Sequence, residues 1–156
     1  MAVMQPFVVA GTGFLLAVLW FDLMFDVQVL RHPGGDDLPE PVLASIAGYY
    51  RRVTTEARPM NRLVAAVMLV TLAGLVAQAV AGDVALWVSV VSLAAALTGF
   101  GLAGARTVPG AVRLGGRGDP PGDQRRLARS ILRDHLVCLA AMATLLVVQL
   151  AWASGH

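Results

Sequence analysis

The sequence contains no lysine and few charged residues of any kind. Charged residues make up 14% of the 156 residues, all twelve basic residues are arginine, and hydrophobic residues make up 57%. Soluble domains usually carry about 25% charged residues, so this composition, with a mean hydropathy of +0.70, favours a membrane protein. The single cysteine, Cys138, has no second cysteine to join, which excludes an intrachain disulfide and a metal-binding cysteine pair.

Four long apolar runs contain most of the hydrophobic residues. Each run is close to the ~20 residues that cross the hydrocarbon core of a bilayer as a helix. The runs also lack the polar stripe that helices of a soluble bundle show. We therefore predict an all-α fold: an integral membrane four-helix bundle that forms one transmembrane domain over residues 1–156, with spans at about 7–30, 60–81, 84–106 and 132–153.

The arginines all lie within or beside two connections, 31–59 and 107–131, which an even number of spans places on one side of the membrane. The positive-inside bias makes this side cytoplasmic. We therefore expect a multi-pass protein of the bacterial inner (cytoplasmic) membrane with both termini outside. Arginines that flank spans in a lipid bilayer explain the basic pI of about 9.3 without a nucleic-acid partner.

The first of these connections has apolar residues at helical spacing, namely Val42, Ile46, Tyr49, Tyr50 and Val53. Arg51, Arg52 and Glu56 fall on the other faces. This pattern is typical of a helix that lies in the plane of the membrane interface. We predict such an amphipathic interfacial helix between spans one and two.

Two aspartates, Asp22 and Asp26, interrupt the first apolar run. An ionised aspartate that faced lipid at the depth of Asp22 would cost about 3 kcal/mol or more, so we expect it to face the bundle. Because residues four apart lie on the same face of a helix, Asp26 should face the bundle too.

Polar residues at the ends of the other spans fall at about the same level as Asp26. Asn61 and Arg62 open span two, Arg106 closes span three, and Arg133, Asp134 and His135 open span four. We therefore predict a buried layer of acids, arginines and one histidine near the cytoplasmic face, in which the arginines meet the two aspartates.

The chemistry of this layer favours an oxidoreductase acting on a small aromatic or quinone-like molecule. In this hypothesis Asp22, Asp26 and His135 are catalytic groups that accept and donate protons. Substrate would be bound by Asn61, Arg62, Arg106, Arg133 and Asp134, with the arginines orienting an oxygen. The acids and the histidine show none of the ligand spacings of zinc enzymes, so no metal site is predicted, and the sequence leaves the cofactor open.

Other interpretations account for the same residues. The arginines could be ordinary flanking charges that reach the headgroups, and the protein could be a non-catalytic auxiliary or assembly subunit of a membrane complex. A haem-binding membrane oxidase and a proton-coupled transporter are further alternatives. Because four spans enclose little interior, we also expect a homo-oligomer or a partner in a membrane complex.

Short motifs at the span ends resemble those of the anthrone-oxygenase-like family of small four-span membrane proteins. The stretches are "ARPMNR" before span two, "RTVP" after span three and "RSILRDH" at the start of span four. Met60, Asn61, Arg62 and His135 match the family pattern, while Ile131 and Leu132 stand where the family has tryptophans. The resemblance implies oxidation of anthrones to anthraquinones without an evident cofactor.

The segment "VLWFDLMF" in span one resembles a second family, the four-span protoporphyrinogen oxidases of bacteria. That family carries a histidine upstream of its Trp-Phe pair. Here no histidine precedes Trp20, so the residue on which haem binding would depend is missing.

Overall fold

The protein is described by a computed structural model that covers residues 4–33 and 38–155, and within these ranges it contains helices and short connections but no β-strand. The helices are α1 (Gln5–Asp26), η1 (Val27–Arg31), α2 (Glu40–Arg51), η2 (Arg52–Glu56), α3 (Arg58–Ala81), α4 (Leu86–Leu102), η3 (Ala103–Thr107), α5 (Val108–Gly116) and α6 (Pro121–Gly155). Residues 34–37 of the predicted connection 31–59 lie outside the described residues.

Four helical stretches are long and apolar enough to cross a membrane: Gln5–Arg31, Pro59–Ala81, Leu86–Gly116 and Pro121–Gly155. Around the bundle, α3 and α6 each pack against both α1 and α4. The predicted all-α membrane bundle is therefore confirmed. The predicted amphipathic helix is α2, which buries Leu43, Ile46, Ala47 and Tyr50 on one face.

The helices extend beyond the apolar runs on the arginine-rich side. The last helix begins at Pro121, because proline is favoured in the first turn of a helix, where its missing N–H is not needed. The third stretch continues to Gly116 through the π-helical turn η3 and then α5, whose first turn contains Pro109. Much of the region predicted as the connection 107–131 is therefore helical.

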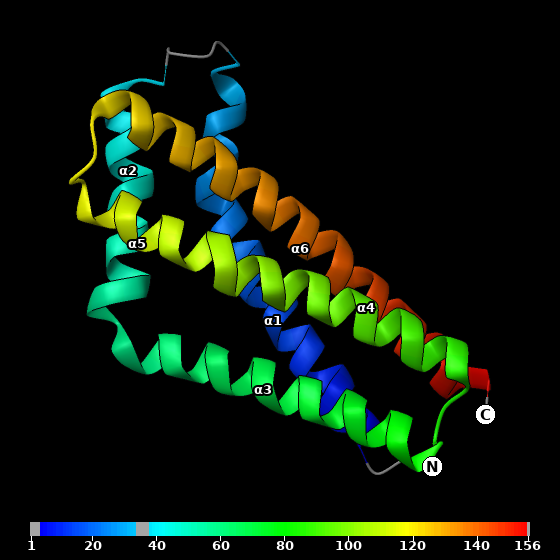
Figure 1. Ribbon diagram of the computed structural model, residues 1–156. Coiled ribbons are helices and arrows are strands. Elements are labelled where there is room, and N and C mark those ends of the chain that lie inside the picture. Colours follow the sequence, from blue (N-terminus) through cyan, green and yellow to red (C-terminus); the bar gives the residue numbers. More distant parts are fainter. Residues whose placement is uncertain (1–3, 34–37, 156) are drawn as a thin grey trace.

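The bundle is narrow at one end and wide at the other. Figure 1 shows α3 and α6 close together near the marked chain ends and far apart where α2 and α5 lie. At the wide end α2 packs against α5, α1 and α6. A Cβ on Gly115 of α5 would come within 2.6 Å of the backbone nitrogen of Arg51, so glycine allows the close approach that seats α2.

Glutamine and serine side chains join the helices at the narrow end. Gln149 of α6 donates from Nε2 to Ser92 Oγ of α4 over 3.0 Å, and it accepts from Gln78 of α3 over 3.4 Å. Gln5 of α1 donates to the backbone oxygen of Gln149 over 2.9 Å. Interhelical hydrogen bonds of this kind stabilise helix association in lipid. They therefore connect all four spans at one level.

We predict that Gln149→Leu weakens this end of the bundle. The substitution removes the bonds to Ser92 and Gln78 and should cost about 1–2 kcal/mol, measured as a lower midpoint of unfolding in detergent. Thr144→Ala is the control, since the Thr144 hydroxyl is exposed and bonds only within its own helix, to the oxygen of Ala140. Equal stability of Gln149→Leu and the wild-type protein would contradict the assigned role.

Candidate functional site

Asp26 is the centre of a buried polar cluster at the wide end of the bundle. Its side chain is fully buried. The Tyr50 hydroxyl of α2 donates to Oδ1 over 2.6 Å, and Nδ1 of His135 on α6 lies 2.6 Å from Oδ2. Because a carboxylate can only accept, His135 donates through Nδ1–H. A buried carboxylate held by two donors joins three elements of the chain.

Asp22 lies one turn earlier on α1 and faces the same cluster. The Tyr49 hydroxyl donates to its Oδ1 over 2.7 Å. Its Oδ2 lies 3.7 Å from Nε2 of His135, which is too far for a hydrogen bond. The structure therefore brings together Asp22, Asp26 and His135, as the sequence predicts, and adds Tyr49 and Tyr50.

Sequence reasoning placed Tyr49 and Tyr50 only on the apolar face of the interfacial helix. A buried tyrosine hydroxyl usually needs a hydrogen-bond partner, and this requirement could have indicated from the sequence that the tyrosines bond to the aspartates. A pair of tyrosines on an apolar helix face, in a chain with two unexplained intramembrane aspartates, could have suggested the pairing. The Tyr49 ring stacks on the Phe25 ring, with centroids 4.1 Å apart, and this contact orients the Tyr49 hydroxyl toward α1.

Burial raises the pKa of both tyrosine hydroxyls above the ordinary value of about 10. The nearby carboxylates raise it further, because a tyrosinate beside Asp22 or Asp26 would add a like charge. Both hydroxyls therefore remain protonated, and remain donors, over the whole physiological pH range.

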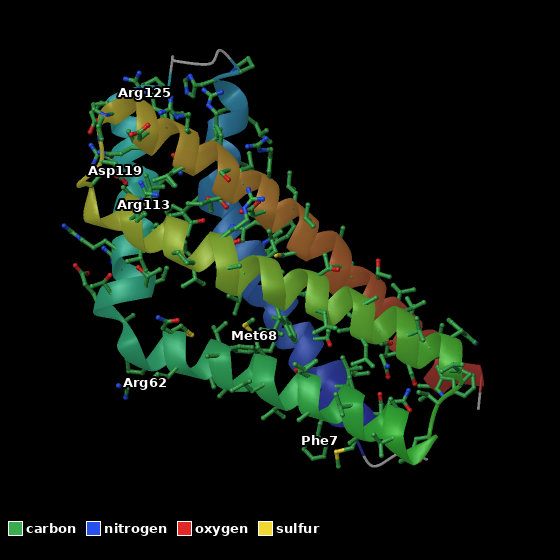
Figure 2. All side chains as sticks on the ribbon, in the orientation of Figure 1. Phe7, Arg62, Met68, Arg113, Asp119 and Arg125 are labelled. Carbon is green, nitrogen blue, oxygen red and sulfur yellow. The ribbon has the colours of Figure 1, made fainter. Side chains whose placement is uncertain are left out.

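The arginines do not join the cluster, which corrects the predicted layer. Among the described residues, the cluster contacts of Asp22 and Asp26 are with tyrosine and histidine. Arg62, Asn61 and Arg133 are exposed, and Figure 2 shows Arg62 pointing outward from the start of α3.

Two other members of the predicted layer pair with each other. Arg106 Nη2 lies 3.4 Å from Oδ1 of Asp134 and donates to Ser130 Oγ over 3.3 Å, while Asn61 donates to the backbone oxygen of Thr54. Burying a guanidinium costs several kcal/mol of hydration free energy. The tyrosine hydroxyls donate to Asp22 and Asp26 without that cost, and His135 donates to Asp26 through Nδ1–H.

A cavity adjoins the cluster in the middle of the bundle. It consists of two adjoining volumes of about 120 and about 130 Å³, and we call them together the central cavity. Both are lined by Val18, Asp22, Val64, Thr107, Val108 and His135. Met68 also lines it, and Figure 2 shows this side chain pointing from α3 toward α4.

Two π-helical turns border the central cavity. Ala103 and Thr107 come from η3, and Val53 and Thr54 come from η2. π-helical turns are rare in proteins as a whole, but those that occur are often found at functional sites. Their position on either side of Asp22 and His135 identifies the central cavity as the candidate functional site. In the part of the chain that the structure describes, no group of three or more acidic, histidine or cysteine side chains is placed to hold a metal ion.

These features define a four-span membrane protein with a carboxylate, tyrosine and histidine cluster beside an apolar cavity. The chain belongs to the SHR3 chaperone family, described as ER membrane protein SH3, whose sequence profile matches residues 1–151. No curated protein and no solved structure matches the chain. The family match overturns the resemblance to the anthrone-oxygenase-like family, which depended on short motifs around Met60, Asn61, Arg62 and His135.

The family match also corrects the predicted location. The family consists of ER membrane proteins, so the expected bacterial inner membrane is wrong. The physical reason is that apolar spans and flanking arginines look alike in any bilayer whose insertion follows the positive-inside bias. The match does not support the predicted oxidoreductase or its quinone-like ligand.

We predict that neither tyrosine ionises near pH 10 in the folded protein. Tyr49 and Tyr50 are the only tyrosines, so tyrosinate absorbance in the ultraviolet should appear near pH 10 only after unfolding. Because the folded pKa lies above the unfolded one, the stabilisation from these groups is complete below about pH 10 and is lost as the pH rises further. Folded protein that titrates near pH 10 would contradict the geometry of the cluster.

We also predict that Tyr50→Phe destabilises the fold more than Tyr49→Phe. Tyr50 is 2% exposed, and its loss leaves fully buried Asp26 short of a donor, at about 1–3 kcal/mol. Asp22 lines the central cavity, where water can replace the Tyr49 hydroxyl. Unfolding of both variants in detergent measures the difference, and the opposite order would show that Asp26 is not the centre of the cluster.

Proposed function

We propose that this chain is a non-catalytic assembly protein of the ER membrane that holds part of another membrane protein while that partner folds or assembles. The family match over residues 1–151 is the observation that carries the proposal. The central cavity lies between all four spans and has mostly apolar walls, which suits contact with a membrane-embedded segment.

Both oxygens of Asp26 already accept a hydrogen bond from the protein, which also favours an assembly role over catalysis. Its two oxygens accept from Tyr50 and His135 at 2.6 Å each, so the carboxylate works as a structural connection between α1, α2 and α6. A general base needs an acceptor within reach of substrate, and Asp26 is fully buried. In this proposal Asp22 and His135 are the polar wall of the partner site.

We further propose that the wide end of the bundle faces the cytosol. Figure 2 shows Arg113, Asp119 and Arg125 together at this end, and Arg113 pairs with Asp119 over 2.9 Å. Arginines near the ends of spans favour this orientation. The exposed apolar residues of the spans, such as Trp20 and Leu69, would face lipid, the partner or a second copy of the chain.

The proposal predicts that loss of this chain causes a subset of multispanning membrane proteins to aggregate. Such proteins are translated into ER microsomes with and without the chain, and the fraction that stays monodisperse in mild detergent is measured. Proteins with a single span are the control. If every multispanning protein stays monodisperse without the chain, the assembly role is wrong.

The enzymatic alternative makes a different prediction and can be tested on the same material. In this alternative the purified protein would oxidise a quinol with dioxygen as the electron acceptor, and Asp22→Asn would abolish that turnover without unfolding the chain. Turnover of this kind would replace the proposed assembly role.

A further inference from the structure

The charges of the cluster do not balance. Asp22 and Asp26 carry two negative charges when ionised, and His135 supplies at most one positive charge. Asp134, the acid next to His135 in sequence, pairs with Arg106. With both carboxylates ionised, the cluster keeps a net negative charge for either form of the imidazole. Such a charge is costly at this depth, and either a proton or a bound cation removes it.

The described residues that line the central cavity supply no basic side chain other than His135. The polar groups that face it are Asp22 of α1, Tyr49 and Tyr50 of α2, Thr54 of η2, Asn61 of α3, Thr107 of η3 and His135 of α6. Arginine is missing from both lining sets. Among the described residues that line the central cavity, only His135 can therefore supply a positive charge to Asp22 and Asp26.

The free atoms of the site point to a ligand with several donors. Nδ1 of His135 donates to Asp26, so in the neutral ring Nε2 is an acceptor. Nε2 and Asp22 Oδ2 lie 3.7 Å apart at the cavity wall, so with a neutral ring they form a pair of acceptors that a donor placed between them would satisfy. The His135 side chain is 8% exposed, so bulk water has little access to it.

The size of the central cavity suits one side chain. A cavity of about 150 Å³ in another protein accommodates benzene, and the two volumes here are about 120 and about 130 Å³. An ammonium group has three donors and a positive charge. Its aliphatic stem would contact Val18, Val64 and Val108, which line both volumes.

We propose that the central cavity binds a lysine side chain of a transmembrane segment of the partner, with the ammonium group between Asp22 and His135. The inference rests on the proposed assembly function and names the kind of segment recognised. A basic residue is costly in lipid, so a segment that carries one gains most from a protein that supplies the counter-charge.

The test uses a single-span host helix of leucine and alanine with either lysine or methionine at the depth of Asp22. Host and full-length chain are reconstituted in phosphatidylcholine vesicles, and association is measured by energy transfer. We expect the lysine host to associate about fivefold to tenfold more strongly than the methionine host.

Variants of the chain separate the site from general attraction. Asp22→Asn should reduce association of the lysine host to that of the methionine host. Asp134→Asn, a change of another carboxylate at the membrane interface, should keep the preference, since Asp134 does not line the central cavity. Ala103→Leu fills part of the cavity without a change of charge and should weaken the association of the lysine host with the chain. A cooperative unfolding transition in detergent shows that each variant is folded.

The outcomes distinguish the inference from the function on which it rests. Equal association of both hosts, or a lysine preference that survives Asp22→Asn, would overturn the lysine site even if multispanning proteins still aggregate without the chain. If these proteins do not aggregate without the chain, the assembly role itself is wrong.

Discussion

The bond of Asp26 to Tyr50 and His135 is the constraint on which the wide end of the molecule depends. A fully buried carboxylate has to be matched by donors, because neither lipid nor an apolar core can solvate it. The two donors come from α2 and α6, so satisfying Asp26 requires α2 to lie across the end of the bundle. Gly115 of α5 permits this position, since a side chain there would meet the backbone of α2.

Buried polar side chains at the two ends of the bundle find hydrogen-bond partners of different kinds. At the narrow end Gln5, Gln78, Ser92 and Gln149 join the spans with neutral hydrogen bonds. These bonds draw the helices together and leave no net charge. At the wide end Tyr49, Tyr50 and His135 donate to the buried carboxylates. The central cavity lies between the spans beside this cluster.

The cavity and the cluster together fit a protein that binds membrane segments. The walls are mostly apolar, which suits contact with a membrane segment, and Asp22 and His135 are the two polar side chains other than Thr107 that line both volumes of the cavity. Residues of the π-helical turns η2 and η3 line the same cavity. Membership of the SHR3 chaperone family agrees with a surface built for another protein rather than for a small oxidisable molecule.

The sequence by itself determined the four spans, the amphipathic helix and the inward direction of Asp22 and Asp26, because run length, periodicity and the cost of charge in lipid can be evaluated along the chain. Counting along the helices also placed His135 at the level of Asp26, which it contacts in the structure. Tertiary structure alone decided which groups meet at that depth. Rotation of each helix about its axis turned Arg62 and Arg133 outward, and the fold-back of α2 brought Tyr50 to Asp26, 24 residues earlier in the chain.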